Sequence, residues 1–280
     1  MDTAPAKRTR GRPRKHHTDA DTGTVQALDR GLHLLSLLSR EHRITLSNLA
    51  MQAGMPPSTA HRLLMTLQSQ KFADFDETTQ EWMIGVEAFR IGSGFLRRIN
   101  LVEASRDVMH NLMTRTGETA NLAIADDGDV VFVSQVETYH PIRAFFRPGA
   151  RSAMHASGAG KALLAQLSKE ELERLLQKKG LPEFTPKTLT RPDALIADLE
   201  QSRKRGWAFD DEERYAGMRC IAAPVFNAYG AAVAGISVSG PTVRFDEERI
   251  QRFSLEVRRA AAELTEKIGG QISDHATATG

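Results

Sequence analysis

Residues 45–70 carry the strongest structural signal in the N-terminal part of the chain, TLSNLAMQAGMPPSTAHRLLMTLQSQ. Thr45 and Gly54 bound a first helical segment, and these residue types favour the start and the end of a helix. The prolines that follow force a turn, because proline is tolerated in the first turn of a helix but not deeper inside. Ser58 or its neighbour caps a second helix, which continues to the end of the stretch. Two helices joined by so tight a turn predict a helix-turn-helix.

The flanking residues extend this pattern to a winged helix-turn-helix. Apolar residues recur with a helical period over 25–39, which predicts an amphipathic helix of about four turns. Apolar and aromatic residues at 72–75 and 82–84 enclose a polar turn and predict a short hairpin. In this fold the start of the third helix contacts base edges and phosphates in the major groove. The candidate DNA-binding residues are Ser47, Ser58, Thr59, His61 and Arg62. Because the folded part of this domain is not basic overall, a solvated polar face that binds no DNA stays open as an alternative.

A basic tail precedes this domain. Residues 1–23 contain six basic and three acidic side chains, a net charge of +3, whereas the rest of the chain carries −1. The composition of the tail is too polar for a core, so residues 1–23 are predicted to be disordered, as are residues 273–280. The sequence RGRPRK at 10–15 resembles an AT-hook, in which arginines enter the narrow minor groove of A·T-rich DNA. We therefore expect DNA contacts from Arg10, Arg12 and Arg14, with a generic phosphate-binding arm as the alternative.

The rest of the chain divides into a linker helix and a larger α+β domain. The expected boundaries are 1–23 for the basic tail, 24–85 for the winged helix-turn-helix, 86–100 for the linker helix, 101–272 for the larger domain and 273–280 for a second tail. Helices are predicted at 102–116, 158–167, 169–178, 192–205 and from Asp246 onwards, and strands at 118–125, 130–136, 142–146, 219–226 and 231–239. Hairpins between long helices are typical of an α+β sheet with one face covered. Such a domain can hold a small-molecule pocket.

The composition excludes several classes of protein. A single cysteine, Cys220, excludes a disulfide framework and any CxxC zinc or redox site. The uncharged run 220–243 is interrupted by Pro224 and a turn, so it predicts a β-hairpin and not a membrane span. No apolar segment follows the basic N-terminus, so we expect no signal peptide and a cytoplasmic protein. The nine histidines lack metal-ligand spacing, and we expect neither a metal nor a cofactor.

Three motifs mark a candidate binding site in the larger domain. MHASGAGKA, residues 154–162, is not a P-loop, but its glycine-rich turn into a helix offers backbone N–H groups to a carboxylate or phosphate. FDDEE, residues 209–213, is an acidic cluster. GISVSG, residues 235–240, places both of its serines on one face of a strand. Each motif is also compatible with plain packing, so the three define a site only if they line one cavity.

Together these residues resemble the IclR family of bacterial transcriptional regulators. The resemblance rests on VQALDRGL at 25–32, on PSTAHRLL at 57–64 and on the three motifs above, in collinear order over about residues 22–270. It implies a winged helix-turn-helix that binds pseudo-palindromic operator DNA, a linker helix that dimerises, and a GAF/PAS-like C-terminal domain that binds a small acid. It further implies a homodimer or a homotetramer built as a dimer of dimers, and a regulator of a catabolic operon, for which repressor and activator both stay open.

The resemblance also implies an effector and its contacts. Carried over position by position, the contacts are Gly158, Ala159, Asp210, Cys220, Ser237 and Ser239. The strings MHASGAGKA, FDDEE and SxSGP are most similar to the glyoxylate-responsive members, so glyoxylate is the expected effector. Those members have an apolar lid with Leu and Met where this chain has Pro141 and Ala144, and an apolar residue where it has Ser152. A different or larger acid therefore stays open.

Two alternative functions follow from the same residues. The first is a regulator of the same family that controls aromatic or sugar-acid catabolism. The second, from another class, is a Cys220-dependent hydrolase or a metabolite-binding module without DNA binding. A hydrolase would use Cys220 as nucleophile, His155 as base and Asp210 as the group that orients the base. No family signature supports that triad, so the chain is predicted not to be an enzyme.

Overall fold

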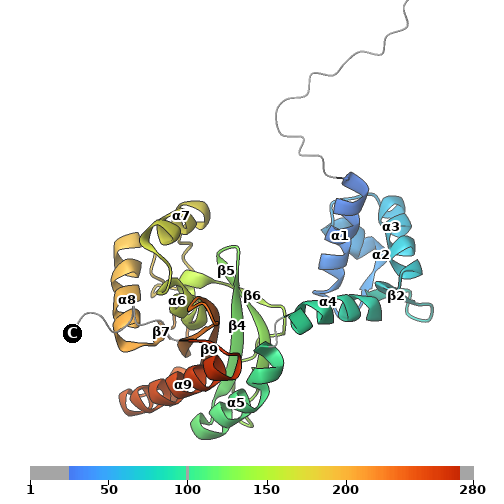
Figure 1. Ribbon diagram of the computed structural model, residues 1–280. Helices are drawn as coiled ribbons and strands as arrows, with labels where there is room; N and C mark the ends of the chain where they lie inside the picture. The colour runs from blue at the N-terminus through green and yellow to red at the C-terminus, as the bar shows by residue number, and fades with distance from the viewer. Residues whose placement is uncertain (1–24, 99–100, 272–280) are drawn as a thin grey trace, which may run out of the picture. The chain divides into compact units, whose positions relative to one another are not determined.

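The computed structural model of the 280-residue chain describes residues 25–98 and 101–271. It divides into two compact units, Met1–Phe95 and Leu96–Gly280, so the division falls inside the predicted linker helix (Figure 1). The predicted tails, with Arg10, Arg12 and Arg14, lie outside the described residues, as do positions 99–100.

The N-terminal unit is a winged helix-turn-helix, as the sequence predicts. Its elements are α1 Gln26–Leu38, β1 Ile44–Thr45, α2 Leu46–Gln52, α3 Pro57–Ser69, β2 Ala73–Asp76, β3 Glu81–Ile84 and α4 Val86–Arg98. The three strands form an antiparallel sheet in the order β1-β3-β2. The pattern did not indicate β1, because a two-residue strand is too short to show alternation. Trp82 is buried in the core of the unit, where its ring lies 4.8 Å from that of Phe75.

Local signals define the two central helices. The Thr45 side chain accepts a hydrogen bond from the Asn48 N–H at 3.5 Å at the start of α2, and Gly54 follows the helix with φ +62°. The prediction that Ser58 or a neighbour caps α3 is wrong. Pro56 is the N-cap residue, no side chain caps the helix, and Pro57 is its first residue. Proline fits that position because its fixed φ is already helical and its missing N–H would have no partner there.

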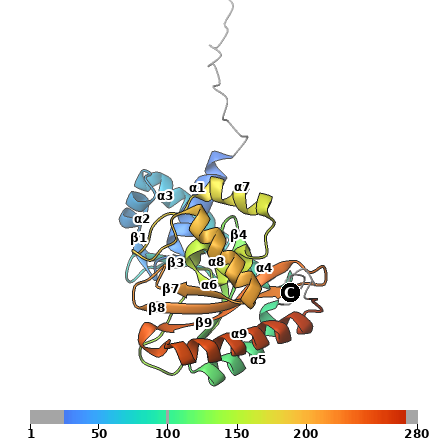
Figure 2. The ribbon, with the colours of Figure 1, turned by 90° about the vertical axis from the view of Figure 1, so that its left-hand side faces the viewer.

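The C-terminal unit is an antiparallel sheet with helices on both faces. Its strands are β4 Thr119–Asp126, β5 Asp129–Val136, β6 Arg151–Ala153, β7 Ala208–Asp211, β8 Met218–Phe226 and β9 Ala232–Pro241, in the order β6-β5-β4-β9-β8-β7. One face is covered by α5 Leu101–Thr116 and α9 Glu247–Lys267. The other is covered by α6 Gly158–Leu164, α7 Lys169–Lys179 and α8 Pro192–Arg205 (Figure 2). The α+β fold is confirmed, whereas the expectation of a single covered face is wrong.

Side chains of the central strands alternate between these two helical layers. Leu122 and Ile221 belong to the α5/α9 side, while their neighbours Ala123 and Ala222 belong to the side of α6. The residues on the α6 side are small, which lets the short helix α6 pack close to the sheet. A Cβ atom added at Gly235 would lie 3.0 Å from the Cβ of Ala159.

The strand predicted at 142–146 is wrong. These residues form no strand, and the sheet edge is the short strand β6 instead. The backbone of the segment is bound by side chains: the Thr119 hydroxyl donates to the Ala144 carbonyl at 3.1 Å, and Arg244 donates to the Ile142 carbonyl at 2.9 Å. Because these contacts satisfy carbonyl groups that a ladder would otherwise pair, the segment lies beside the sheet as a loop. The structure also contains strand β7, in a segment for which the sequence pattern predicts no strand.

Candidate effector cavity and DNA-binding surface

The predicted DNA-binding residues lie at the starts of α2 and α3. Ser47, Ser58, His61 and Arg62 are exposed, and Thr59 is half-buried. The opposite side of α3 is anchored by the buried Ala60 and Leu64. Within the described part of the chain, the Ser58 and Arg62 side chains have no hydrogen-bond or ion-pair partner. They are therefore available to bases or phosphates.

The C-terminal unit brings all six predicted effector contacts into one cavity of about 30 Å³. It is lined by Gly158, Ala159, Asp210, Cys220, Ser237 and Ser239, together with Phe132, Phe146, Ser152, Ala156, Ser157, Arg214 and Tyr215. Strand register explains the meeting of residues so far apart in sequence. Cys220 stands directly opposite Asp210 on β7 and opposite Ser239 on β9. Residues directly opposite one another share a face of the sheet, so a row of polar groups crosses three strands beneath α6.

The polar groups of the cavity are not all satisfied by the protein. Ser237 is 1% exposed, and within the described residues its hydroxyl lacks a well-formed hydrogen bond, having only the weakly bonding Cys220 thiol as a partner. A buried hydroxyl without a well-formed hydrogen bond is costly, which makes it a group that a ligand could satisfy. The Asn121 side chain donates to the Ser239 hydroxyl at 3.3 Å, which orients that oxygen.

The start of α6 forms the other wall of the cavity. A Cβ atom added at Gly158 would lie 2.8 Å from the Cys220 Sγ and 3.2 Å from the Cys220 carbonyl oxygen. The glycine is therefore needed for the close approach of helix and strand, not for an unusual backbone angle. Ser157 caps the helix by accepting from the Gly160 N–H at 3.1 Å.

The environment of Asp210 favours its neutral form. Burial, followed by the negative charge of Glu213, raises the pKa of Asp210 from 3.8 to about 7. The Glu213 backbone N–H donates to the Asp210 carboxylate at 2.8 Å and opposes this rise only in part. Near pH 7 the carboxyl group can therefore either donate or accept a hydrogen bond.

We predict that Asp210 makes the stability of the C-terminal unit depend on pH. A folded-state pKa above the unfolded value adds stability that is fully present below about pH 4 and is lost as the pH rises through about 7. A shift of three pKa units corresponds to about 4 kcal/mol at most. Denaturant unfolding of the wild-type protein and of Asp210→Asn at pH 4 to 8 should show a steeper loss of stability in the wild type. Parallel curves for the two proteins would contradict the prediction.

The hydrolase alternative finds no support in the geometry. Burial, reinforced by the charge of Asp210, raises the pKa of the Cys220 thiol to about 11, so the thiol is protonated at neutral pH. The thiolate is the nucleophilic form of cysteine. His155 does not line the cavity, and its Nε2 lies 3.0 Å from the Pro182 carbonyl oxygen. The proposed nucleophile and base therefore do not form a pair in this structure.

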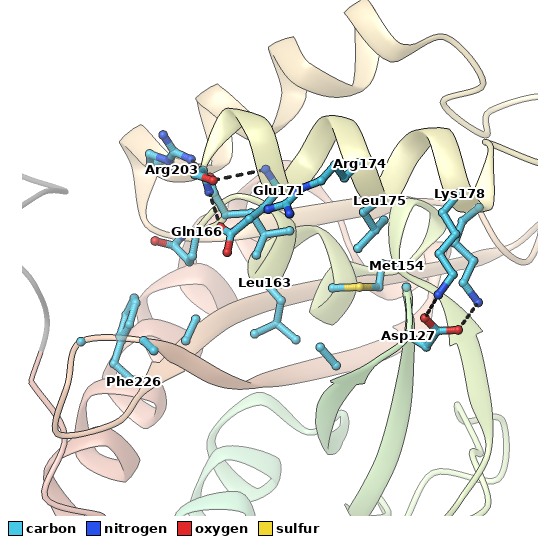
Figure 3. A pocket seen from close by; sticks show the side chains of 18 residues that line it. Asp127, Met154, Leu163, Gln166, Glu171, Arg174, Leu175, Lys178, Arg203 and Phe226 are labelled. Carbon is cyan, nitrogen blue, oxygen red and sulfur yellow. Dashed lines mark hydrogen bonds and ion pairs between the residues drawn. The ribbon is translucent and has the colours of Figure 1, made fainter.

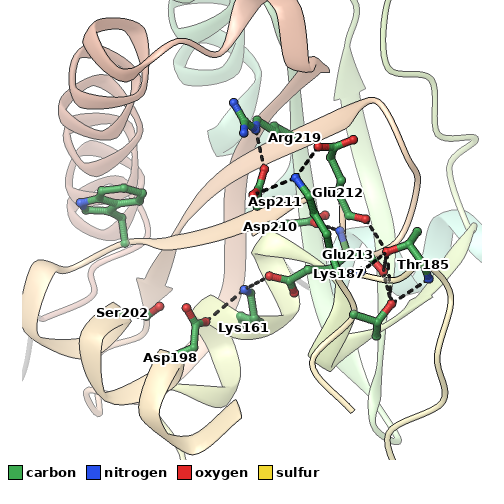
Figure 4. A network of polar contacts seen from close by, with 12 residues as sticks. Lys161, Thr185, Lys187, Asp198, Ser202, Asp210, Asp211, Glu212, Glu213 and Arg219 are labelled. Atoms are coloured by element: carbon green, nitrogen blue, oxygen red, sulfur yellow. Dashed lines mark hydrogen bonds and ion pairs between the residues drawn. The ribbon is translucent and has the colours of Figure 1, made fainter. Parts of the chain in front are cut away.

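The lysine of the MHASGAGKA motif is structural. Lys161 is fully buried, and its Nζ lies 2.6 Å from Glu213 Oε1 and 3.0 Å from Asp198 Oδ2 (Figure 4). These contacts connect α6 with α8 and with the segment that follows β7. Lys187 makes a similar pair of contacts, with Asp211 at 3.1 Å and with Glu212 at 2.5 Å. The acidic cluster is thus largely neutralised by lysines, with Asp210 left facing the cavity.

The apolar wall of the cavity comes from residues that the sequence pattern did not indicate. Phe132 and Phe146 stack with ring centroids 4.3 Å apart and an interplanar angle of 10°, and both line the cavity. Of the positions expected to form the lid, Ser152 lines the cavity, whereas Pro141 and Ala144 do not. A stacked pair from β5 and the following loop therefore forms the apolar wall of the cavity.

A larger hollow of the unit lies elsewhere. A groove of about 860 Å³ runs between α7, the end of α6 and the turns after β4 and β8 (Figure 3). It contains none of the six predicted contacts. Four basic residues line it: Lys178 and Lys179 pair with Asp127, while Arg174 and Arg203 donate to backbone carbonyls of Glu170, Ala165 and Leu167. Because convergent unpaired polar groups mark a ligand site better than size does, we assign the smaller cavity as the candidate site.

An exposed helix-turn-helix joined to an α+β domain is the architecture of a DNA-binding transcriptional regulator. Residues 27–77 match the family described as "IclR helix-turn-helix domain", and residues 93–266 match "Bacterial transcriptional regulator IclR C-terminal". The chain belongs to the IclR family and is a DNA-binding transcriptional regulator of the IclR type.

Similar proteins agree with this assignment. The HTH-type transcriptional regulator BhcR of Paracoccus denitrificans is 51% identical over 261 residues, 92% of this chain and 94% of that protein. The transcriptional repressor IclR of Escherichia coli is 44% identical over 270 residues, 95% and 98% of the two chains. The crystal structure of the Thermotoga maritima IclR has a TM-score of 0.74 at 31% identity and covers 87% of this chain and 99% of that one. These relatives are regulators and not enzymes, which confirms that expectation.

Within 25–98 and 101–271, no helix combines the length and apolar composition that a membrane span requires.

Proposed function

We propose that the protein is a cytoplasmic homo-oligomer, a dimer or a dimer of dimers, that releases or binds a pseudo-palindromic operator in response to glyoxylate. The observation that carries the proposal is the meeting of the six predicted contacts in one small cavity. The cavity is small, about 30 Å³, and is lined partly by aromatic side chains, so it favours a small acid over an aromatic or sugar acid. The aromatic or sugar-acid alternative would require Phe146 or Tyr215 to move outwards.

The chemistry of the cavity suits glyoxylate. The hydroxyls of Ser237 and Ser239 and the backbone N–H groups of Gly158 and Ala159 can donate to a carboxylate. Asp210 can accept a hydrogen bond from a hydroxyl of the hydrated aldehyde. A small acid in this cavity would touch α6 and three strands at once. It could therefore favour one arrangement of the unit over another, with about 1–3 kcal/mol of coupling to DNA binding.

The DNA side of the proposal rests on α3. Two protomers would place the Ser58–Arg62 segments in successive major grooves roughly 34 Å apart. Arg10, Arg12 and Arg14, which lie outside the described residues, would extend into neighbouring minor grooves.

We predict specific binding to DNA from upstream of the protein's own gene, altered by millimolar glyoxylate. Arg62→Ala should weaken operator binding by about 1–3 kcal/mol, because an exposed arginine without a partner in the protein is free to contact a base or phosphate. Fluorescence anisotropy with and without glyoxylate measures both effects. Arg40→Ala, at an exposed arginine that follows α1, serves as the control. Specific operator binding that does not change with glyoxylate would contradict the proposal that glyoxylate is the effector. Equal binding by the Arg62 and Arg40 variants would contradict the placement of α3.

A further inference from the structure

An acidic effector brings a charge into the cavity that the six predicted contacts do not balance. They supply hydroxyls, a thiol, backbone groups and the carboxyl of Asp210, but no cation. Moving an anion from water into a small cavity beside a carboxyl group is unfavourable unless an opposite charge lies close by. Among all the residues that line the cavity, Arg214 is the one lysine or arginine.

The side chain of Arg214 contacts two aromatic rings. Its guanidinium lies 3.8 Å from the ring centroid of Phe184, which does not line the cavity, and 5.4 Å from that of Tyr215, which does. Its Nε is buried and has no hydrogen-bond partner among the described residues. By contrast, Arg219 donates to the Asp211 carboxylate, and Arg244 donates to that of Glu118. Arg214 is therefore a cation whose buried donor is unused.

The aromatic contacts prepare this side chain for an anion. Stacking on a ring fixes the plane of a guanidinium without occupying its N–H groups. A planar guanidinium with free donors matches a carboxylate, which it can bind through two parallel hydrogen bonds.

The segment that carries Arg214 is itself held in place next to Asp210. The Glu213 N–H donates to the Asp210 carboxylate, and the Thr188 hydroxyl donates to the Glu213 carbonyl at 2.6 Å. The Glu213 side chain is bound to Lys161. These contacts fix the residue directly before Arg214 at the edge of the cavity.

We propose that Arg214 is the specificity-determining residue of the effector cavity and neutralises the carboxylate of the bound acid. This inference rests on the proposed function of the cavity. The Ser237 and Ser239 hydroxyls orient the ligand, while Arg214 selects an anion over a neutral molecule of the same size.

The test is isothermal titration calorimetry of the full chain with glyoxylate and, as an uncharged probe, with glyoxylamide. Arg214→Gln should weaken glyoxylate binding about 10- to 100-fold, because it removes a charged hydrogen-bond donor. Arg214→Lys should bind with intermediate affinity, because it keeps the charge but loses the fork of donors. Lys187→Gln is the matched control, since Lys187 is a nearby cation that does not line the cavity. It should bind glyoxylate like the wild type. Glyoxylamide should not distinguish wild type from Arg214→Gln.

Operator binding without acid measures whether the variants are folded and should be the same for all of them. Equal glyoxylate affinity of wild type and Arg214→Gln would overturn this inference and leave the proposed function intact. An equal loss of glyoxylate affinity in Lys187→Gln would overturn it as well, because the loss would then come from the net charge of the protein and not from Arg214 itself. A wild-type protein that binds operator but no glyoxylate would overturn the proposed function and this inference together.

Discussion

Lys161→Met is expected to lower the free energy of unfolding of the C-terminal unit by about 3–5 kcal/mol. Lys161 is fully buried between the carboxylates of Glu213 and Asp198. Methionine has a similar length but no charge, so both carboxylates would lose their counter-ion. Breaking a buried ion pair by removing one partner is strongly destabilising, because it leaves an uncompensated buried charge.

Denaturant unfolding measures this effect, and two further variants isolate its cause. Lys187→Met removes a lysine that also contacts two carboxylates but is half-exposed, so it should change stability by less than about 1 kcal/mol. The double variant Lys161→Met/Glu213→Gln removes the nearer charge along with the lysine and should recover part of the loss. If Lys161→Met unfolded at the same denaturant concentration as the wild type, the network would not contribute to stability.

Loss of the Lys161 charge would also affect the candidate effector cavity. Burial raises the pKa of Glu213, while the charge of Lys161 opposes that rise. Without the lysine, Glu213 would be more readily protonated, and its negative charge would act less on Asp210. The segment that carries Asp210 and Arg214 would also lose its attachment to α6. Lys161 of the glycine-rich motif therefore holds the residues of the cavity wall in place, but it does not line the cavity itself.

The helix-turn-helix was predictable because its signals are local. A cap at Thr45, a left-handed glycine at Gly54 and a proline at position 57 act within a few residues of where they stand. The two serines of β9 were also predictable as a pair, because alternation along a strand depends only on sequence spacing. Both line the cavity, as their shared face requires.

The cavity as a whole depends on contacts that sequence spacing does not encode. β4 pairs with β9, so Asn121 stands opposite Ser237 although more than a hundred residues separate them. The row from Asp210 to Ser239 needs β7, a four-residue strand with too short a pattern to stand out. The cation–π contact of Arg214 with Phe184 joins two loops of irregular structure. Only a resemblance to known proteins indicated the six contacts together, and it did not indicate Arg214 or the stacked phenylalanines.

The glycine at the start of α6 should prove as important for effector binding as any polar residue. Gly158→Ala is expected to abolish the effect of glyoxylate on operator binding while leaving operator binding itself in place. The added Cβ would lie 2.8 Å from the Cys220 Sγ, closer than real Cβ contacts allow, so helix and strand must separate or tilt. The methyl group would narrow a cavity of only about 30 Å³ and would displace the start of α6, which lines the cavity through Gly158 and Ala159.

Two companion variants separate loss of space from loss of fold. Overpacking of this kind typically costs about 1–3 kcal/mol, which a folded unit can tolerate. Adding Cys220→Ala removes Sγ, the nearest of the atoms that the new methyl group meets, so the double variant should regain stability. Gly31→Ala is the matched control, because an added Cβ on α1 meets no atom within 4 Å and alanine favours a helix. Anisotropy on operator DNA with a glyoxylate titration measures all four proteins. A Gly158→Ala protein with a normal response would mean that the acid binds somewhere other than between α6 and β8.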